Sequence, residues 1–401
     1  MPQLTEPANL PPQPFNQTDL VFFNTTLRQT FHITTPSTYL RLRLSNAFGG
    51  ANLPITAATI AVPLASGIGN GNLTGSSLIN TTTVQHLTFS GEAEISIPPG
   101  ALAVSDPIYF PVHANQILSI SLYLANGQST QSITSHPGSR TSSYLSRGDW
   151  TASKNLTDSS TQEVFHWYFI SALEAWSEPA VSSFVVVGDS ITDGRSSYNN
   201  ANGRWTDLLF NRLHYHSSST NNPALGNIAV SNQAAGGNRV LADGAGPSAL
   251  SRIERDVIAH PGVKYAMTLE GVNDIGTAMA TMEAQRVVGD ALIQAYKQMF
   301  TRMHTAGIAV FGGNPLREET RMRVNEWIRG SVGMAGGFDG LVDFDEVMKN
   351  PINSTEMNPL LNSGDCLHPN PEGYQVMADA FPVELFEKLE KGSEYICVVP
   401  D

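Results

Sequence analysis

The sequence predicts two domains: an antiparallel β-sandwich with a jelly-roll-like arrangement over residues 1–180, and a doubly wound α/β domain over residues 181–401. Three observations predict this division. A length of 401 residues exceeds one ordinary globular core. Charged side chains number 16 in residues 1–180 but 43 in residues 181–401. Apolar residues alternate with polar ones in the first part, whereas they form short continuous runs in the second.

The composition excludes several classes of protein. Hydrophobic residues make up 41% of the chain, which excludes a disordered protein. No apolar run approaches the roughly 20 residues that a membrane-spanning helix needs. A net charge of −13 argues against a surface that binds nucleic acid. The two cysteines are too few for a disulfide scaffold or for a zinc cluster of four thiolates.

The first domain is predicted from strands with one apolar face. Residues 38–44 and 117–124 alternate at period two, which places one face on a core and the other in water. Turn residues separate such runs, and no long helical pattern occurs before about residue 170. These features are typical of an antiparallel sandwich.

The second domain is predicted from five apolar runs that alternate with helical segments. The runs, which are typical of parallel strands covered on both faces, are Phe184–Val187, Ile228–Val230, Tyr265–Leu269, Ile308–Phe311 and Leu341–Val342. The helical segments are Trp205–Leu213, Val287–Met299 with an end near Gly307, Glu318–Ile328 and Glu372–Leu389. This alternation predicts three layers, with functional residues at the carboxyl ends of the strands.

A serine follows the first of these strands, in the sequence Gly188-Asp189-Ser190. At a sharp turn from strand to helix, a serine hydroxyl is exposed above the sheet and its N–H lies free near a helix start. Ser190 could therefore attack a carbonyl group and help to hold the resulting oxyanion. On this turn alone, the simpler interpretation is that Ser190 caps the helix.

The next two strands also end in residues that could contact a ligand. The second leads to the pair Gly236 and Gly237, where the backbone could approach a ligand closely and offer an N–H. The third leads to Asn273, whose amide could donate to an oxyanion. Each feature by itself is also typical of an ordinary loop or turn.

A histidine that could act as a base precedes the last helix. Asp365 lies three residues before His368, so its carboxylate can fold back to accept the second ring N–H of that histidine. The ring tautomer would then be fixed and the imidazolium stabilised. Together with the serine turn, this spacing favours a catalytic over a structural histidine.

These pieces, in this order, resemble the SGNH hydrolases, also called the GDSL esterase/lipase family, over about residues 184–390. The resemblance implies a three-layer, flavodoxin-like α/β/α fold with Ser190 as the nucleophile, Asp365 as the orienting acid and His368 as the base. It also implies an oxyanion hole made by the N–H groups of Ser190 and Gly237 and the Asn273 amide, with Gly236 as the alternative to Gly237. The sequence around Arg204 and Trp205 further resembles a branch of aryl- and carbohydrate esterases with an N-terminal β domain.

The predicted function is a serine esterase that needs no cofactor and uses an acyl-enzyme. The resemblance implies short, acetyl-like acyl groups on carbohydrate or aryl alcohols. A short-chain lipase or an acyltransferase with the same triad is an alternative, and a glycan-binding protein that uses the β-sandwich is an alternative from another class. No Gly-x-Ser-x-Gly elbow occurs, which disfavours the other common serine-hydrolase fold.

We expect no metal site, because among ten histidines only His214 and His216 lie close together. The acidic cluster of Asp343, Asp345 and Glu346 is interpreted as a solvated turn. The expected partner is a small-molecule or carbohydrate ester, with no nucleic acid and no membrane span.

The expected location is outside the cell. No signal peptide is visible at the N-terminus, yet six Asn-x-Ser/Thr sites occur, at Asn16, Asn24, Asn72, Asn80, Asn155 and Asn353. We favour a secreted protein that lacks its leader over a cytoplasmic one. In that setting Cys366 and Cys397 could be joined, which would tie the C-terminal tail to the loop of Asp365 and His368.

Overall fold

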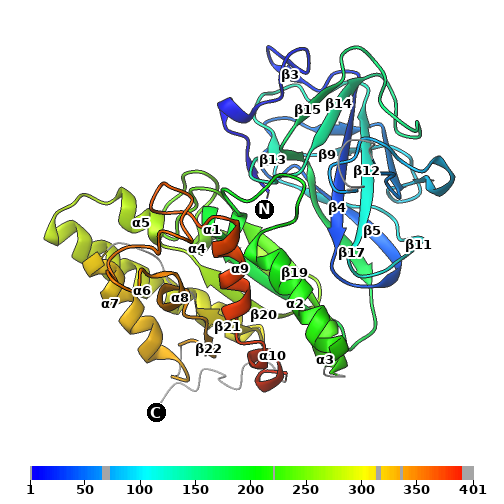
Figure 1. Ribbon diagram of the computed structural model, residues 1–401. Helices are drawn as coiled ribbons and strands as arrows, with labels where there is room; N and C mark the ends of the chain where they lie inside the picture. Colours follow the sequence, from blue (N-terminus) through cyan, green and yellow to red (C-terminus); the bar gives the residue numbers. More distant parts are fainter. Residues whose placement is uncertain (1, 66–72, 220–221, 313–317, 335–336, 391–401) are drawn as a thin grey trace. The chain divides into compact units, whose positions relative to one another are not determined.

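The computed structural model describes residues 2–65, 73–219, 222–312, 318–334 and 337–390 (Figure 1). The chain divides into two compact units. The first consists of Met1–Glu178 together with Tyr198–Asn202, and the second of Pro179–Ser197 together with Gly203–Asp401. The boundary between the two units falls between Glu178 and Pro179. After it, continuous apolar runs replace the alternating pattern in the sequence.

Two antiparallel sheets make up most of the first unit. The larger has the strand order β15-β14-β4-β12-β7-β8, and in the smaller β5 pairs with β10, β11 and β17. Strands of the larger sheet are β4 (Thr25–Ile33), β7 (Ala57–Ala61), β8 (Gln85–His86), β12 (Gln116–Leu124), β14 (Ser143–Arg147) and β15 (Gln162–Val164). Strands of the smaller are β5 (Ser37–Ser45), β10 (Leu102–Val104), β11 (Ile108–Val112) and β17 (Ile170–Trp176). Both alternating runs predicted from the sequence are therefore strands, β5 and β12.

Short pieces complete the first unit. One three-stranded sheet has the order β1 (Gln3–Leu4), β13 (Thr134–His136) and β16 (Trp167–Tyr168). Two further antiparallel pairs join β2 (Asn16–Gln17) to β3 (Leu20–Val21) and β6 (Leu53–Ile55) to β9 (Ile95–Ile97). Single 3-10 turns occur at η1 (Pro7–Asn9) and η2 (Thr81–Thr83).

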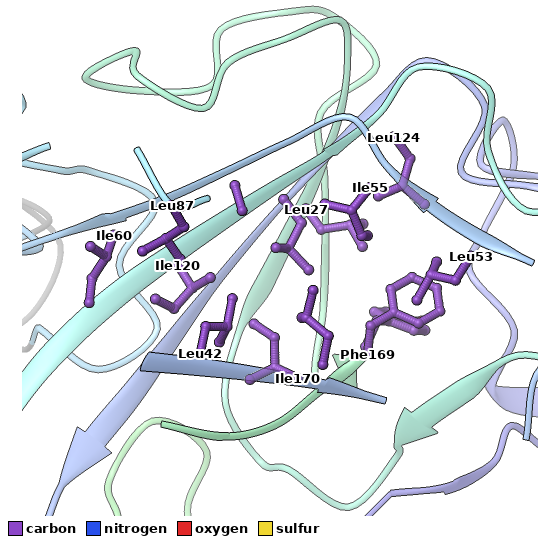
Figure 2. Close-up of a cluster of buried hydrophobic side chains, with 14 of the residues drawn as sticks. Leu27, Leu42, Leu53, Ile55, Ile60, Leu87, Ile120, Leu124, Phe169 and Ile170 are labelled. Atoms are coloured by element: carbon purple, nitrogen blue, oxygen red, sulfur yellow. The ribbon is translucent and has the colours of Figure 1, made fainter. Parts of the chain in front are cut away.

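The two main sheets share one hydrophobic core. Figure 2 shows Leu27 of β4 and Ile120 of β12 in the same buried cluster as Leu42 of β5. The opposite side of β12 differs from the prediction, because Ser121 is only 2% exposed instead of facing water. Its hydroxyl accepts a hydrogen bond from Nε of Arg28 at 2.9 Å. This buried arginine also donates to three main-chain carbonyls, at Ser77, Trp150 and Ser153, so loops cover the face that alternation assigns to solvent.

The segment Tyr198–Asn202 is held inside the first unit, although it follows the serine turn in sequence. The Asn200 N–H donates to the Arg140 carbonyl at 2.8 Å. The Asn200 side chain accepts from the Ser142 N–H and donates to the Ser142 hydroxyl, each at 2.8 Å. The chain therefore leaves the second unit after Ser197 and returns to it at Gly203.

A five-stranded parallel sheet forms the centre of the second unit, with the order β19-β18-β20-β21-β22. Its strands, which confirm the five predicted apolar runs, are β18 (Ser182–Gly188), β19 (Ile228–Ala234), β20 (Val263–Leu269), β21 (Ala309–Gly312) and β22 (Gly340–Leu341). With the strands numbered in chain order, this is 2-1-3-4-5, a doubly wound arrangement. Successive strands are added toward one edge of the sheet and then toward the other, and the switch point lies between the first and third strands. That switch point lies beside β18, the strand that leads to Ser190.

Helices cover both faces of this sheet. Successive residues of β18 point to opposite faces, so they belong to two different buried clusters. Phe184 and Val186 belong to one buried cluster, and Val185 and Val187 belong to the other. Helices that pack residues into the first cluster include α2 (Trp205–Ser219), α8 (Phe344–Met348), α9 (Pro371–Ala380) and α10 (Glu384–Lys388). Those in the second include α4 (Ala249–Ile253), α6 (Met282–Thr305) and α7 (Glu318–Ser331). The predicted three-layer fold is confirmed (Figure 1).

The helical predictions hold for three of the four segments. Gly307, with φ of 75°, follows α6 and donates to the His304 carbonyl at 2.8 Å, as expected of a C-terminal cap. The prediction of one helix over Glu372–Leu389 is wrong. Pro382 lies inside that segment, has no N–H to donate and separates α9 from α10.

The helix start expected at Ser190 is the short helix α1 (Ser190–Asp193). Other short elements were not predicted from the sequence: α3 (Pro223–Gly226), α4, α5 (Val272–Thr277) and α8, and a single π-helical turn, η3 (Glu254–Ile258), that continues α4. Among the helices of the described ranges, none combines the length and the apolar character needed to cross a membrane.

Candidate active site

Three of the predicted motifs start at the same edge of the parallel sheet. Gly188, the last residue of β18, is in register with Ala234 of β19 and with Leu269 of β20. The segments that begin at Asp189, Ala235 and Glu270 therefore leave the sheet side by side. This is the edge at which doubly wound folds place their sites.

The turn after β18 frees the Ser190 hydroxyl from a capping role. Asp189 has extended backbone angles, and its Oδ1 accepts the Ile191 N–H at 2.9 Å, so Asp189 is the residue that caps α1. A side chain at Gly188 would meet Thr192, because a Cβ there would lie 2.4 Å from the Thr192 Cβ. The strand consequently turns into α1 without an intervening loop. The geometry thus removes the interpretation of Ser190 as a helix cap.

Ser190, His368 and Asp365 lie in one chain of hydrogen bonds. Ser190 Oγ is 2.8 Å from Nε2 of His368, and Nδ1 of His368 is 2.6 Å from Oδ2 of Asp365. A carboxylate can only accept, so the Nδ1–H donates to it and Nε2 is left to accept the serine hydroxyl. Ser190 and His368 are 7% and 6% exposed, which keeps their hydrogen bond largely out of water. A base is therefore placed and oriented beside a nucleophile.

The loop around Asp365 keeps its carboxylate charged. Burial alone would raise the pKa of Asp365, but the N–H groups of His368 and Leu367 and the His368 ring outweigh it and hold the pKa well below its usual range. Oδ1 accepts the His368 N–H at 2.8 Å and the Leu367 N–H at 3.0 Å. Cys366 in this loop is exposed. Its predicted partner, Cys397, lies outside the described residues, so the disulfide stays a prediction.

Two of the predicted oxyanion donors, Asn273 and Gly237, adjoin Asn238. Asn273 Nδ2 donates to the Asn238 carbonyl at 2.9 Å, and the amide has a second hydrogen for another acceptor. Gly237, the preceding residue, has a φ of 73°, which favours glycine. Neither the Gly236 nor the Gly237 N–H makes a hydrogen bond within the described part of the chain. Both glycines therefore stay candidates for the backbone donor.

Two buried carboxyl groups at this edge of the sheet, those of Asp189 and Glu270, had no role predicted from the sequence. Asp189 and Glu270 are 1% and 0% exposed. Burial raises the pKa of Asp189 to about 7, and the charges of Asp274 and Asp193 add to it, against the hydrogen bond from the Ile191 N–H. Burial also raises the pKa of Glu270, as does the Asp189 charge, while the Arg252 charge lowers it. The only sequence signal was an acidic residue directly after each of two buried strands.

The variant Asp189→Asn should become more stable than the wild type as the pH rises. The folded state keeps a proton on Asp189 up to about pH 7, whereas the unfolded chain loses it near pH 3.8, so the wild type loses stability between these values. Asparagine keeps the Oδ1 acceptor for the Ile191 N–H but cannot ionise. The gain at pH 8 is at most about 4 kcal/mol, the free energy equivalent of a pKa shift of about three units.

Urea unfolding at pH 4 and pH 8 measures this difference. The exposed Asp379→Asn is the control and should show no gain that grows with pH. An equal change in Asp189→Asn at both pH values would mean that the effect does not come from ionisation.

The acidic cluster of Asp343, Asp345 and Glu346 is more structured than the predicted solvated turn. Asp343 caps α8 and pairs with Arg329 at 2.8 Å, and Asp345 pairs with Arg329 at 3.0 Å and also with Arg321. The cluster therefore joins α8 to α7 through ion pairs. No group of three or more histidine, cysteine or acidic residues in the described ranges could hold a metal ion.

A small pocket lies within the second unit, and Ser190 and His368 are not among its lining residues. Two of its walls, Ile191 and Pro369, directly follow Ser190 and His368 in the chain. Its remaining lining residues are Leu269, Phe344, Asp345, Met348, Lys349, Ser354, Glu356, Met357 and Met377. The cavity volume is about 30 Å³, and apolar side chains supply most of its wall. Such a pocket suits a small apolar group.

Comparison with known proteins identifies one family. Residues 184–381 match the family model of the GDSL-like lipase/acylhydrolases. This range begins in β18 and ends just after α9, so it contains Ser190, Asn273 and His368. No curated protein matches the chain.

Several solved structures are similar to the chain. A lipolytic protein of the G-D-S-L family from Desulfitobacterium hafniense is 20% identical, with a TM-score of 0.38, over 51% of this chain and 99% of that one. A catalytic mutant of an acetylxylan esterase from Geobacillus stearothermophilus is 20% identical, with a TM-score of 0.39, over 51% and 94%. A family two carbohydrate esterase from Clostridium thermocellum, in complex with cellohexaose, is 13% identical, with a TM-score of 0.39, over 92% and 94%.

Proposed function

Because the chain belongs to the GDSL (SGNH) family of ester hydrolases through residues 184–381, we propose that its second unit hydrolyses short-chain carboxylic esters through an acyl-enzyme on Ser190. The observation that carries this proposal is the hydrogen-bonded series Ser190–His368–Asp365. It supplies a nucleophile, a base and an orienting acid in one line.

The reaction then runs in two halves. Nε2 of His368 takes the proton of the Ser190 hydroxyl as Oγ attacks the ester carbonyl, and Asp365 stabilises the imidazolium through Nδ1. The Ser190 and Gly237 N–H groups and the Asn273 amide receive the oxyanion. The imidazolium gives its proton to the departing alcohol, which leaves the acyl group on Ser190. A water molecule, deprotonated by His368, attacks the acyl carbon and releases the acid.

A preference for short acyl groups is supported by a small pocket whose lining includes Ile191 and Pro369, the residues that follow Ser190 and His368. Its cavity volume is about 30 Å³, so we expect a short acyl group to fit it better than a long one. The leaving alcohol is a different substituent of the reacting carbon, and we expect this pocket not to restrict it. A carbohydrate or aryl alcohol, expected from the sequence resemblance, stays our proposal for the leaving group.

The hydrolysis of p-nitrophenyl acetate, butyrate and octanoate tests this specificity. We expect kcat/KM to fall by about tenfold or more from acetate to octanoate, because a longer chain must displace packed side chains. The variant Met357→Ala removes part of the pocket wall and should reduce this fall. A kcat/KM that rises with chain length would instead favour the lipase alternative. An acyltransferase would pass the acyl group to added glycerol in preference to water.

A further inference from the structure

One buried arginine uses its whole hydrogen-bonding capacity beneath the proposed oxyanion hole. Arg252 of α4 is 2% exposed. Its Nε donates to Asn238 Oδ1 at 3.2 Å, and Nη2 donates to the same oxygen at 2.7 Å. Nη1 donates to the Gln233 carbonyl at 2.7 Å and to Asp256 at 3.1 Å, and Nη2 also donates to Glu270 at 3.3 Å. These five contacts account for the five N–H groups of a guanidinium.

These contacts hold three segments together. Gln233 lies in β19, Asn238 lies in the loop that follows it, and Glu270 directly follows β20. A guanidinium can serve all three because it is planar and presents fixed, diverging donors, whereas a lysine ammonium is a single point charge. The flanking carboxylates of Asp256 and Glu270 compensate the buried positive charge. Arg252 thus fixes the spacing between the two strand ends that carry the proposed oxyanion donors.

Asn238 transmits this constraint to the donors. Besides the two bonds from Arg252, its Nδ2 donates to the Pro247 carbonyl at 2.8 Å and its N–H donates to the Ala235 carbonyl at 3.2 Å. Its own carbonyl accepts Nδ2 of Asn273 at 2.9 Å. Asn238, whose side chain is held by Arg252, therefore orients the Asn273 amide. Asn238 is also the next residue after Gly237 in the chain.

We propose that Arg252 is a positioning residue for the oxyanion hole, which acts through Asn238 on the Asn273 amide and the Gly237 N–H. This rests on the proposed function of Ser190 and its neighbours. Arg252 touches no reacting atom. Its contribution appears only when negative charge develops on the carbonyl oxygen, so it should affect kcat and leave KM nearly unchanged.

The variant Arg252→Lys tests the proposal, with p-nitrophenyl acetate as the substrate. We expect kcat to fall about 10- to 100-fold, because small displacements of oxyanion donors have effects of this size, with KM within about threefold of the wild type. The control is Arg28→Lys, which replaces another fully buried arginine that donates to carbonyls, but in the first unit. It should lose stability while its folded fraction keeps the wild-type kcat.

A double-mutant cycle with Asn273→Ala separates positioning from a merely structural role. If Arg252 acts through Asn238, Arg252→Lys should lower kcat much less in the Asn273→Ala background than in the wild type. Equal losses in both backgrounds, or an unchanged kcat in Arg252→Lys, would overturn the proposal. Should Arg252→Lys fail to fold, Asn238→Ala replaces it in the cycle with the same expectation, since it removes the acceptor of Arg252 and keeps the backbone carbonyl.

A second readout keeps this test independent of the choice of ester. A fluorophosphonate probe reacts with an activated serine, and its phosphoryl oxygen occupies the oxyanion hole. The labelling rate of Ser190 should therefore fall in Arg252→Lys in parallel with kcat. Labelling that requires Ser190 but is as fast in Arg252→Lys as in the wild type would overturn the role of Arg252 alone. Labelling that does not require Ser190 would overturn the proposed function itself.

Discussion

Replacement of Ser190 by alanine is expected to abolish ester hydrolysis, with kcat lowered by on the order of 10⁴-fold or more. The hydroxyl lies 2.8 Å from Nε2 of His368, and the variant removes the only atom in that line that can form the acyl-enzyme. The remaining donors can still polarise a bound ester, so a small residual rate above that of water is expected. The fold should be unaffected, because Asp189 and not Ser190 caps α1.

The measurement is the turnover of p-nitrophenyl acetate, together with the mass of the protein quenched in acid during turnover. The wild type should carry an acetyl group on Ser190, and Ser190→Ala should carry none. The control is Ser183→Ala in β18, the strand that precedes Ser190, whose hydroxyl donates to the Pro261 carbonyl at 3.0 Å. It should keep kcat within about twofold. Substantial turnover by Ser190→Ala would mean that the nucleophile is another residue.

Local patterns were sufficient to predict the parallel sheet and the Ser–His–Asp series. A strand covered on both faces must be apolar throughout, and Phe184–Val187 shows this without any knowledge of its neighbours. Asp365 and His368 are three residues apart, so their contact can be predicted from the sequence. Their approach to Ser190 follows once the strand order places the serine turn at the carboxyl edge of the sheet.

The features that the sequence did not predict depend on contacts between distant segments. Arg252 lies on a five-residue helix with no apolar periodicity, and its partners include a backbone carbonyl and an asparagine side chain that no motif identifies. The burial of Ser121 likewise depends on loops that cover β12. In the sequence, Asp189 is recognised only as part of the serine motif. Its raised pKa arises from burial and from the charge of Asp274, which is distant in the chain.

The variant Asp365→Asn is expected to lower kcat by about 10³- to 10⁴-fold at neutral pH. Oδ2 of Asp365 now accepts the His368 Nδ1–H at 2.6 Å. An asparagine amide in that place can donate to Nδ1, which favours the tautomer with its hydrogen on Nε2. Nε2 could then no longer accept the Ser190 proton. The asparagine Oδ1 can still accept the N–H groups of His368 and Leu367, so the loop should keep its shape.

The pH dependence of this loss adds a test of the electrostatics. Hydrogen bonds hold the pKa of Asp365 well below its usual range, against the effect of burial, so the wild-type carboxylate stays charged down to at least pH 5. The ratio of wild-type to Asp365→Asn activity should therefore not shrink through protonation of Asp365 between pH 8 and pH 5. Glu372→Gln, at an exposed position in the first turn of α9, is the control and should keep kcat within about twofold. A loss of less than tenfold in Asp365→Asn would mean that another group orients His368, because an unoriented imidazole cannot hold its Nε2 lone pair on the Ser190 hydroxyl.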